Sequence, residues 1–316
     1  MKKVFINGGG PRPGLEELSE KYEVIFPPRG GFAPGELEAI LPEVDAILAM
    51  GTVTRAQIEL AKKTQLICCF GAGYDRIDME AANEYKIPVC NIPQATARPT
   101  AELTVSIMLA CARRIAELDK LSRADTPVNA GAYLGTTLGG LQLGIVGVGH
   151  IGSYVASICR ALGMKIAYYD IAPVPEERIG QAQFMPFDEL IATSDVITIH
   201  CPYNEHTANM FNKDVFAKMK KSAILVNAAR GGIVDYDALT HALQTGAIQG
   251  TALDVFPNEP HIPEALKTLD NVVLTPHVGT NTTQSRIDMC KACADAIVIA
   301  LEGNRPPNIV NPWVVE

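Results

Sequence analysis

The sequence lacks the features of a membrane protein, a secreted protein and a nucleic-acid-binding protein. No run of about 18 apolar residues occurs, so no membrane-spanning helix is expected. The first apolar stretch, Val4–Ile6, is too short for the core of a secretory signal peptide. The net charge is −8 and the basic residues form no cluster, which argues against binding to nucleic acid or to an anionic membrane. We therefore expect a cytoplasmic globular protein that binds neither.

The cysteines form no pattern that is typical of disulfides or zinc sites. Most of the eight lie within apolar strand or helix patterns, as expected for buried, reduced thiols of a cytoplasmic protein. One CxxC motif, Cys290–Cys293, lies in the middle of a predicted helix, and no second pair completes a tetrahedral site. We interpret this motif as core packing and expect no bound metal.

Both halves of the chain alternate short apolar strands with helical segments. The length of 316 residues suggests about two domains. The predicted strands of the first set are residues 4–7, 23–26, 46–50, 66–70 and 89–92. Those of the second set are residues 141–146, 165–170, 195–199, 222–228, 250–255 and 271–276. The alternation predicts two parallel sheets covered by helices, with long helices near residues 99–121 and 281–301.

A glycine-rich turn follows the first strand of the second set. Gly147, Gly149 and Gly152 are spaced as G-x-G-x-x-G between that strand and a helical pattern. The first glycine permits a tight turn, the second lets the backbone approach a pyrophosphate, and the third lets the helix pack close to the sheet. The free N–H groups and the dipole of the helix N-terminus would then hold the phosphates. The pattern predicts a dinucleotide-binding site.

An acidic residue at the end of the next strand supports this prediction. Asp170 lies 18 positions after Gly152, where a carboxylate would hydrogen-bond an adenosine ribose. A strand-end turn or a helix cap is the alternative for an isolated Asp. Asp170 is followed by Ile171 and Ala172, so no Arg or Lys is placed there to pair with a 2′-phosphate. Because the carboxylate would also repel that phosphate, the sequence predicts NAD (NADH) rather than NADP.

Three charged or titratable side chains follow later strands of the second set. Arg230, Glu259 and His277 each come after a different strand, at the sheet edge that would hold the dinucleotide. Each residue by itself is typical of a surface position or a cap, but together they favour catalysis. An Arg binds a carboxylate through two hydrogen bonds, a His donates a proton near neutral pH, and a Glu beside the His orients its ring. This set predicts hydride transfer between NADH and a 2-oxo acid.

With these residues, the sequence resembles the D-isomer-specific 2-hydroxyacid dehydrogenase family over nearly its whole length. The matching segments are Gly71–Asp75, the glycine turn with Asp170, His200–Pro202, Asn227–Asp235, Ala252–Pro260 and Thr275–Gly279. The resemblance implies an α/β fold of two doubly wound parallel-sheet domains. A Rossmann cofactor domain of residues 98–284 would be inserted into a flavodoxin-like substrate (catalytic) domain of residues 1–97 and 285–316. A homodimer formed through the cofactor domains is implied as well.

The resemblance also implies roles for individual residues. Arg230 would bind the carboxylate and the carbonyl of the substrate, and Glu259 would partner His277, the proton donor in reduction. The backbone N–H groups of Ala72 and Gly73 would meet the substrate carboxylate. Further cofactor contacts, beside the glycines and Asp170, are implied for His150, Ile151, Cys201, Pro202, Ala228 and Asp254.

The substrate and the finer activity stay open at this point. Arg98 departs from the family pattern, and we hypothesise that it holds an anionic substrate such as a dicarboxylate; an exposed surface Arg is the alternative. Glyoxylate, hydroxypyruvate or a larger 2-oxo acid all fit the motifs. An NAD-sensing binding protein of the corepressor type, or a phosphite- or formate-type dehydrogenase, is the alternative function.

Overall fold

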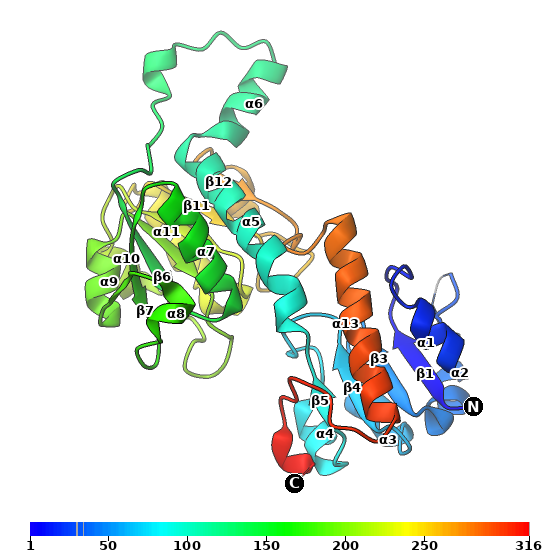
Figure 1. The fold of residues 1–316 in the computed structure, drawn as a ribbon. Helices are drawn as coiled ribbons and strands as arrows, with labels where there is room; N and C mark the ends of the chain where they lie inside the picture. Colours follow the sequence, from blue (N-terminus) through cyan, green and yellow to red (C-terminus); the bar gives the residue numbers. More distant parts are fainter. Residues whose placement is uncertain (30, 34, 316) are drawn as a thin grey trace. The chain divides into compact units, whose positions relative to one another are not determined.

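A computed structural model describes residues 1–29, 31–33 and 35–315. The chain divides into two compact units, Met1–Thr96 with Thr280–Glu316 (unit 1) and Ala97–Gly279 (unit 2). Each unit is built around one parallel β-sheet (Figure 1). The domain boundaries expected from the sequence, 97/98 and 284/285, stay predictions about the functional domains.

Unit 1 contains a five-stranded sheet in the order β2-β1-β3-β4-β5. Its strands are β1 (Lys3–Asn7), β2 (Glu23–Ile25), β3 (Ala46–Ala49), β4 (Leu66–Cys69) and β5 (Val89–Cys90). The central strands β3 and β4 are buried throughout, which explains their continuous apolar runs. Because every pair in this sheet is parallel, all the strands end at the same edge.

Helices cover both faces of the unit 1 sheet. One core cluster joins the sheet to residues of α1 (Glu16–Lys21) and α13 (Thr283–Leu301), among them Leu18 and Ile297. The other core cluster includes residues of α3 (Arg55–Leu60) and α4 (Met79–Glu84), and α2 (Glu36–Ile40) packs against it. A capping box formed by Thr54 and Gln57 fixes the start of α3.

Unit 2 contains a seven-stranded parallel sheet in the order β12-β11-β10-β9-β6-β7-β8. Its strands are β6 (Gln142–Val146), β7 (Lys165–Tyr169), β8 (Gln183–Phe184), β9 (Val196–Ile199), β10 (Ile224–Asn227), β11 (Gly250–Leu253) and β12 (Val272–Leu274). The sequence predicts six of these strands. Strand β8 was missed because its two residues are both exposed and give no alternating pattern.

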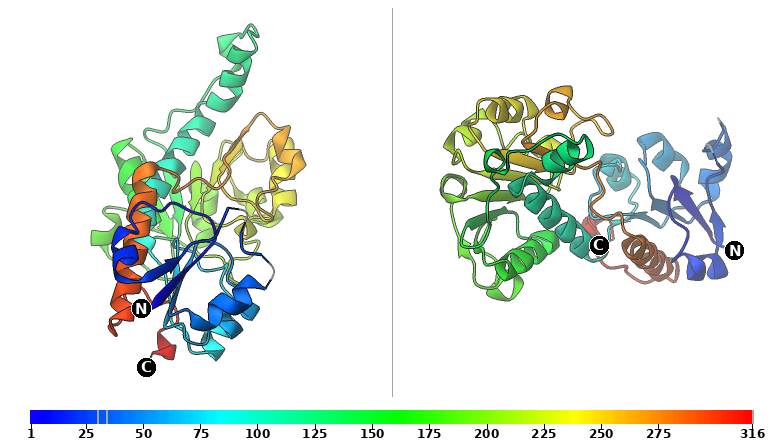
Figure 2. Two further views of the ribbon diagram at one scale, coloured as in Figure 1. Left: turned by 90° about the vertical axis from the view of Figure 1, so that its right-hand side faces the viewer. Right: turned by 90° about the horizontal axis from the view of Figure 1, so that it is seen from above.

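Helices also cover both faces of the unit 2 sheet, as Figure 2 shows. On one face lie α5 (Pro93–Ala112) and α7 (His150–Ala161). On the other lie α9 (Phe187–Thr193), α10 (Lys213–Lys218) and α11 (Tyr236–Gln244). Two short helices, α8 (Glu176–Ile179) and α12 (Glu264–Lys267), lie in the connections.

The prediction of a single helix over residues 99–121 is wrong. The chain forms two helices, α5 and α6 (Ile115–Arg123), because Arg114 adopts a left-handed φ of 54° between them. Nothing in the apolar spacing of this segment signals the break. Its consequence is that α6 leaves the direction of α5 and extends away from the sheet of its own unit (Figure 1).

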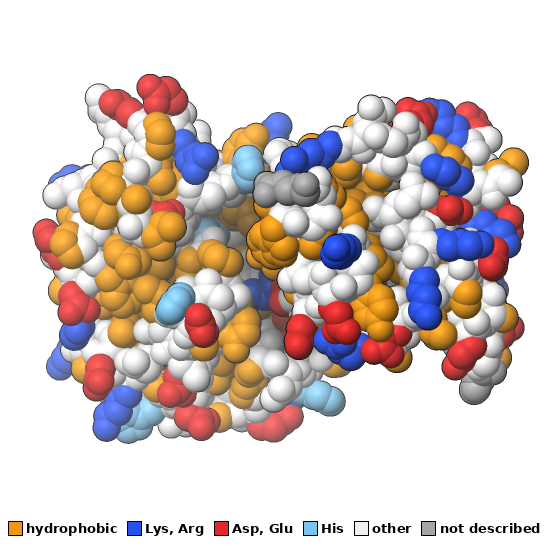
Figure 3. Space-filling model, turned by 90° about the horizontal axis from the view of Figure 1, so that it is seen from below, with side chains coloured by type: hydrophobic (Ala, Val, Ile, Leu, Met, Phe, Trp, Pro, Cys, Tyr) orange, Lys and Arg blue, Asp and Glu red, His pale blue; other side chains and the backbone are white. Residues whose placement is uncertain are grey.

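The cysteines and the surface agree with a globular protein. All eight thiols are free, and all except the partly buried Cys201 are buried. Both cysteines of the CxxC motif pack in the unit 1 core, and no group of three metal-ligating side chains occurs within the described ranges. None of the helices in those ranges combines the length and apolarity that crossing a bilayer requires. On the face drawn in Figure 3, acidic and basic side chains are interspersed.

Candidate active site

The glycine-rich turn lies between β6 and α7, where the strand order of the unit 2 sheet reverses. Gly147 has a φ of +93°, and a Cβ there would lie 2.5 Å from the backbone nitrogen of Cys201. A Cβ on Gly152 would lie 2.4 Å from the carbonyl oxygen of Gly147. A Cβ on Gly149 would meet nothing within 4 Å. The outer glycines therefore permit close packing, and the middle one leaves open space before α7.

This geometry fits the diphosphate of a dinucleotide. The N-cap residue of the 12-residue helix α7 is Gly149, which has no side chain to cap the helix N-terminus. With no capping side chain at Gly149, the first backbone N–H groups and the dipole of α7 can face an anion at the open side of this residue. His150 and Ile151 are the first residues of this helix, as the predicted cofactor contacts require.

Asp170 is held in a fixed orientation directly after β7. Its Oδ2 accepts the N–H of Val148 at 2.7 Å, and its Oδ1 accepts the N–H of Ile171 at 2.8 Å. Each carboxylate oxygen can accept a further hydrogen bond. The residue thus joins the glycine turn to the end of the neighbouring strand, and it presents a negative charge beside the turn.

The loop after β9 packs under the glycine turn. His200 Nε2 lies 2.9 Å from Thr198 Oγ1, whereas its buried Nδ1 has no hydrogen-bond partner in the described part of the chain. Burial lowers the pKa of His200 to about 3, so its ring is neutral near pH 7. Burial also raises the pKa of Cys201 to about 11, so this residue stays an uncharged thiol. The first three residues of this loop, His200, Cys201 and Pro202, therefore add no charge next to the turn.

Arg230 is presented by a tight loop after β10. The buried Asn227 ends this strand; its Oδ1 accepts the N–H of Ala229 at 3.0 Å, and its Nδ2 donates to the carbonyl of Arg230 at 2.9 Å. A Cβ on Gly231 would lie 2.2 Å from the carbonyl carbon of Phe256, so the two loops touch backbone to backbone. Only glycine permits this approach, which brings the loop of Arg230 against the loop that follows β11.

The loop after β11 organises the loop after β12. Asp254 directly follows β11 and is 1% exposed. Its carbonyl oxygen accepts the N–H of His277 at 2.8 Å, and its carboxylate accepts the N–H groups of Val278 and Gly279, each at 2.9 Å. His277 has a left-handed φ of 53° in this turn. Three consecutive N–H groups are thus held by one residue.

His277 and Glu259 form the central contact of the site. The Nδ1 of His277 lies 2.7 Å from Oε2 of Glu259. Because a carboxylate only accepts hydrogen bonds, Nδ1 carries the proton and Nε2 is left to face a substrate. The other carboxylate oxygen, Oε1, accepts the N–H of Phe256 at 3.2 Å. The side chain of His277 is 41% exposed, so a small molecule can reach it.

The remaining predicted residues lie in three places. Ala228 is buried directly after β10, on the same sheet edge as the other predicted cofactor contacts. Ala72 and Gly73 lie in unit 1, in the loop after β4, and neither N–H has a protein acceptor in the described ranges. Arg98 lies on α5 with its side chain 76% exposed, and its Nε donates to Glu102 Oε1 at 3.0 Å. In this structure Arg98 therefore belongs to a surface ion pair.

Two polar residues of the site, the buried Asn227 and the partly buried Thr275, have no role predicted from the sequence. Asn227 shapes the loop of Arg230, and the hydroxyl of Thr275 donates to Asp254 Oδ1 at 2.6 Å. Each stands at the carboxyl end of an apolar strand. A polar residue in that position is a signal that sequence reasoning could use.

A doubly wound parallel sheet with this turn at its reversal point is the dinucleotide-binding fold. Residues 105–279, more than half of the chain, match the family model described as D-isomer specific 2-hydroxyacid dehydrogenase, NAD binding domain. The chain belongs to the D-isomer-specific 2-hydroxyacid dehydrogenase family, as the resemblance of its motifs indicates. The expected fold class, two parallel-sheet α/β domains of which one is a Rossmann domain, is confirmed.

Individual relatives cover almost the whole chain. A provisionally named 2-hydroxyacid dehydrogenase of Staphylococcus aureus (strain MRSA252) is 38% identical over 98% of this chain and 100% of its own. The NAD complex of a D-isomer specific 2-hydroxyacid dehydrogenase from Lactobacillus delbrueckii ssp. bulgaricus has a TM-score of 0.82 at 28% identity, covering 98% and 100%. An NADPH-dependent glyoxylate/hydroxypyruvate reductase from Sinorhizobium meliloti has a TM-score of 0.87 at 27% identity, covering 98% and 96%. The first of these two structures is a complex with NAD, and the second is a complex with NADP and malonate.

Proposed function

We propose that the protein is an NAD-dependent dehydrogenase that reduces a 2-oxo acid, such as glyoxylate, hydroxypyruvate or a larger acid, to the D-2-hydroxy acid. The observation that carries the proposal is the 2.7 Å contact between His277 and Glu259 at the sheet edge that bears the glycine turn. This pairing is what a general acid needs: a ring fixed at Nδ1 with Nε2 directed outward. The family supports the reaction class, and the site supports the individual roles.

Each side chain has a distinct task in the proposed reaction. The guanidinium of Arg230 binds the substrate carboxylate, since its planar N–H groups match the two oxygens. The Nε2 of His277 donates a proton to the carbonyl oxygen as negative charge develops there. Glu259 stabilises the protonated ring and keeps it oriented. When bound, the nicotinamide of NADH supplies the hydride.

The preference for NAD over NADP rests on Asp170. Its carboxylate is fixed beside the glycine turn by two backbone N–H groups, and the next residues, Ile171 and Ala172, are uncharged. A 2′-phosphate in this place would meet a negative charge without a cation on these two residues. The seven buried thiols support a reducing compartment, so we also propose a cytoplasmic location.

The function is tested by following NADH oxidation with a panel of 2-oxo acids, including glyoxylate, hydroxypyruvate, phenylpyruvate and 2-oxoglutarate. We expect one acid to show a dominant kcat/KM and, for every acid except glyoxylate, whose product is achiral, the product to be the D isomer. The variant His277→Ala should lose turnover and keep its Kd for NADH. Absence of turnover with every acid, while NADH still binds, would contradict the proposal and favour the NAD-sensing alternative; reduction of NAD⁺ by formate or phosphite would favour the other alternative.

We also propose that the protein is a homodimer, with α6 and the segment after it as the contact surface. Although α6 has apolar and charged faces, none of its residues is buried. Ile115 at its start is 53% exposed, and Leu134 in the following segment is 76% exposed. Exposed apolar side chains gathered on one projecting segment are typical of an interaction surface. This surface lies in unit 2, and the family resemblance implies a homodimer formed through the cofactor domains.

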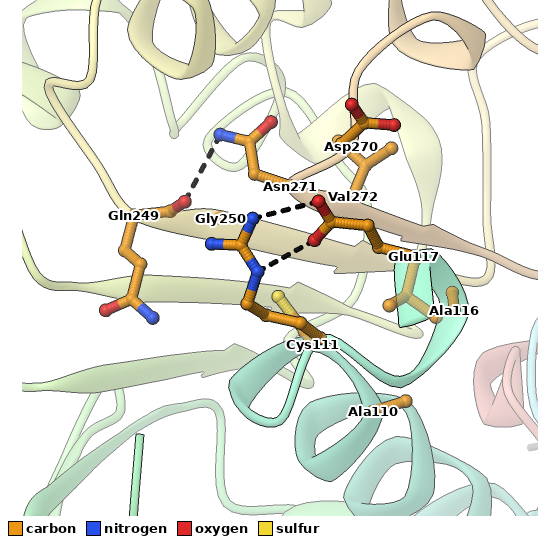
Figure 4. Close-up of a pocket in the computed structure, with 11 residues that line it drawn as sticks. Ala110, Cys111, Ala116, Glu117, Gln249, Gly250, Asp270, Asn271 and Val272 are labelled. Atoms are coloured by element: carbon orange, nitrogen blue, oxygen red, sulfur yellow. Dashed lines mark hydrogen bonds and ion pairs between the residues drawn. The ribbon is translucent and has the colours of Figure 1, made fainter. Parts of the chain in front are cut away.

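The start of α6 is fixed by a bidentate ion pair. Arg114 donates to both oxygens of Glu117, at 2.7 and 3.0 Å, and the Glu117 side chain is only 9% exposed. The pair lines a small cavity of about 30 Å³ between the α5–α6 junction and the N-terminal ends of β11 and β12 (Figure 4). We infer that the Arg114–Glu117 ion pair helps to set the direction in which α6 leaves α5.

Light scattering during size-exclusion chromatography tests the dimer. We expect a mass of twice 33.9 kDa. The variant Leu134→Asp should shift the protein towards monomer, whereas Ile171→Asp, which makes the same kind of change at an exposed residue outside this surface, should not. A wild-type protein that elutes as a monomer at all concentrations would contradict the proposal.

A further inference from the structure

The turn that carries His277 is strained and is held in place from outside. A residue other than glycine in the left-handed region is strained, and such a conformation persists only where its surroundings determine it. The φ of His277 is 53°. Asp254 supplies the acceptors for the N–H groups of residues 277, 278 and 279. The position of the His277 ring therefore depends on the position of Asp254.

The carboxylate of Asp254 is itself oriented by one hydroxyl. Thr275 Oγ1 donates to Asp254 Oδ1 at 2.6 Å, a short hydrogen bond to a charged acceptor. Oδ1 also accepts from Val278, and Oδ2 accepts from Gly279. The hydroxyl of Thr275 thus completes a closed set of donors around a carboxylate that is 1% exposed.

Loss of the Thr275 hydroxyl would let the Asp254 carboxylate rotate and would move the turn that carries His277. The carboxylate would keep two backbone donors but lose the side-chain donor that restrains its rotation. A buried carboxylate that lacks one donor relaxes or admits water, and both changes move the turn. A displacement of about 1 Å at a reacting group can reduce turnover by about 100-fold.

We propose that Thr275 is a positioning residue for His277. Its hydroxyl fixes the Asp254 carboxylate, and this carboxylate fixes the turn from which His277 presents Nε2. The inference rests on the proposed function, because it assigns Thr275 a task in proton donation by His277. It concerns orientation only, since the hydroxyl of Thr275 contacts Asp254 Oδ1 at 2.6 Å and the carbonyl of Leu253 at 3.5 Å rather than the His277 ring.

Three variants separate positioning from stability. Thr275→Val removes the hydroxyl and keeps the branched shape, and Thr275→Ser restores the hydroxyl. Thr251→Val is the matched control, because Thr251 is buried in the same sheet and its Oγ1 donates to the carbonyl of Leu225 at 2.9 Å, away from His277. We expect Thr275→Val to lower kcat by about 10- to 100-fold with an unchanged Kd for NADH. Thr275→Ser should return kcat to within about threefold of wild type, and Thr251→Val should lower Tm with little change in kcat.

A double-mutant cycle with His277→Ala decides the inference. If Thr275 acts through His277, adding Thr275→Val to His277→Ala should not lower kcat further. Full additivity in the double variant, equal effects of Thr275→Val and Thr251→Val on kcat, or a Thr275→Ser variant as slow as Thr275→Val would each overturn the inference and leave the proposed function intact. Near-wild-type turnover of His277→Ala would overturn the proposed function and this inference with it.

Discussion

The Nδ1 of His277 lies 2.7 Å from Oε2 of Glu259, although the two residues follow different strands of the unit 2 sheet. Glu259 is in turn held through its Oε1 by the N–H of Phe256. The carboxylate of Glu259 therefore links the backbone of its own loop to the ring of His277, the proposed proton donor. This arrangement makes the charge of Glu259, and not only its shape, part of the proposed chemistry.

Replacing Glu259 by Gln should separate charge from shape. The Gln side chain can still accept a hydrogen bond from Nδ1, but it no longer stabilises the protonated ring electrostatically. We expect kcat for reduction of the 2-oxo acid to fall by about 10- to 100-fold, with an unchanged Kd for NADH. Steady-state kinetics and fluorescence titration measure the two quantities. Glu264→Gln, at an exposed residue of the same unit, is the control, and an equal loss of kcat in both variants would count against the role of Glu259.

The cofactor preference makes a separate prediction at Asp170. We expect the wild-type kcat/KM to be about 100-fold higher with NADH than with NADPH, a difference of about 3 kcal/mol. Asp170→Asn removes the charge while keeping an acceptor for the N–H of Val148. It should therefore narrow the preference to less than about tenfold, chiefly by improving the use of NADPH. Equal use of both cofactors by the wild-type protein would show that Asp170 does not select NAD.

The sequence alone was informative where local spacing reflects a physical requirement. The G-x-G-x-x-G spacing identified a turn whose glycines are needed for close backbone approach, at Gly147 and Gly152. Continuous apolar runs identified central strands such as β9 and β10, because strands in a parallel sheet are buried on both faces. The same reasoning placed Arg230 and His277 after strands that end at one edge.

Other features depend on contacts between distant residues and left no local pattern. The left-handed turn at Arg114 replaces a predicted continuous helix, and the apolar spacing around it does not indicate the break. The hydrogen bond from Thr275 to Asp254 spans 21 positions in the chain. The ion pair of Arg98 with Glu102 is different, because these residues are four positions apart on α5 and their spacing is readable in the sequence.

Arg98 can be tested with paired substrates. If it leaves Glu102 to hold a second carboxylate, Arg98→Ala should raise KM for a dicarboxylic 2-oxo acid by about tenfold and leave KM for glyoxylate unchanged, because only the former has a second anionic group. Glu102→Gln is the matched variant, since it breaks the surface ion pair without removing the cation. It should leave KM for both acids unchanged or lower KM for the dicarboxylic one. Unchanged KM values for both acids in Arg98→Ala would leave Arg98 as a surface ion-pair residue.

His200 should make stability depend on pH in the acidic range. Burial lowers its pKa from 6.5 to about 3 in the folded protein, so the unfolded chain binds a proton at pH values where the folded one does not. The contribution of His200 to the free energy of unfolding is therefore fully present above about pH 6.5. This contribution decreases as the pH falls from 6.5 towards 3. Between pH 7 and pH 5 we expect a loss of about 2 kcal/mol from this residue.

Urea unfolding at pH 7 and pH 5 measures this loss in the wild type and in His200→Gln. Gln stays neutral over the whole range and can still bond with Thr198, the partner of the His200 ring. The variant should therefore lose less stability than the wild type between the two pH values, even if it is less stable at pH 7. His206→Gln is the control, because the side chain of His206 is 84% exposed. Equal losses in the wild type and His200→Gln would show that the His200 ring is not held neutral by burial.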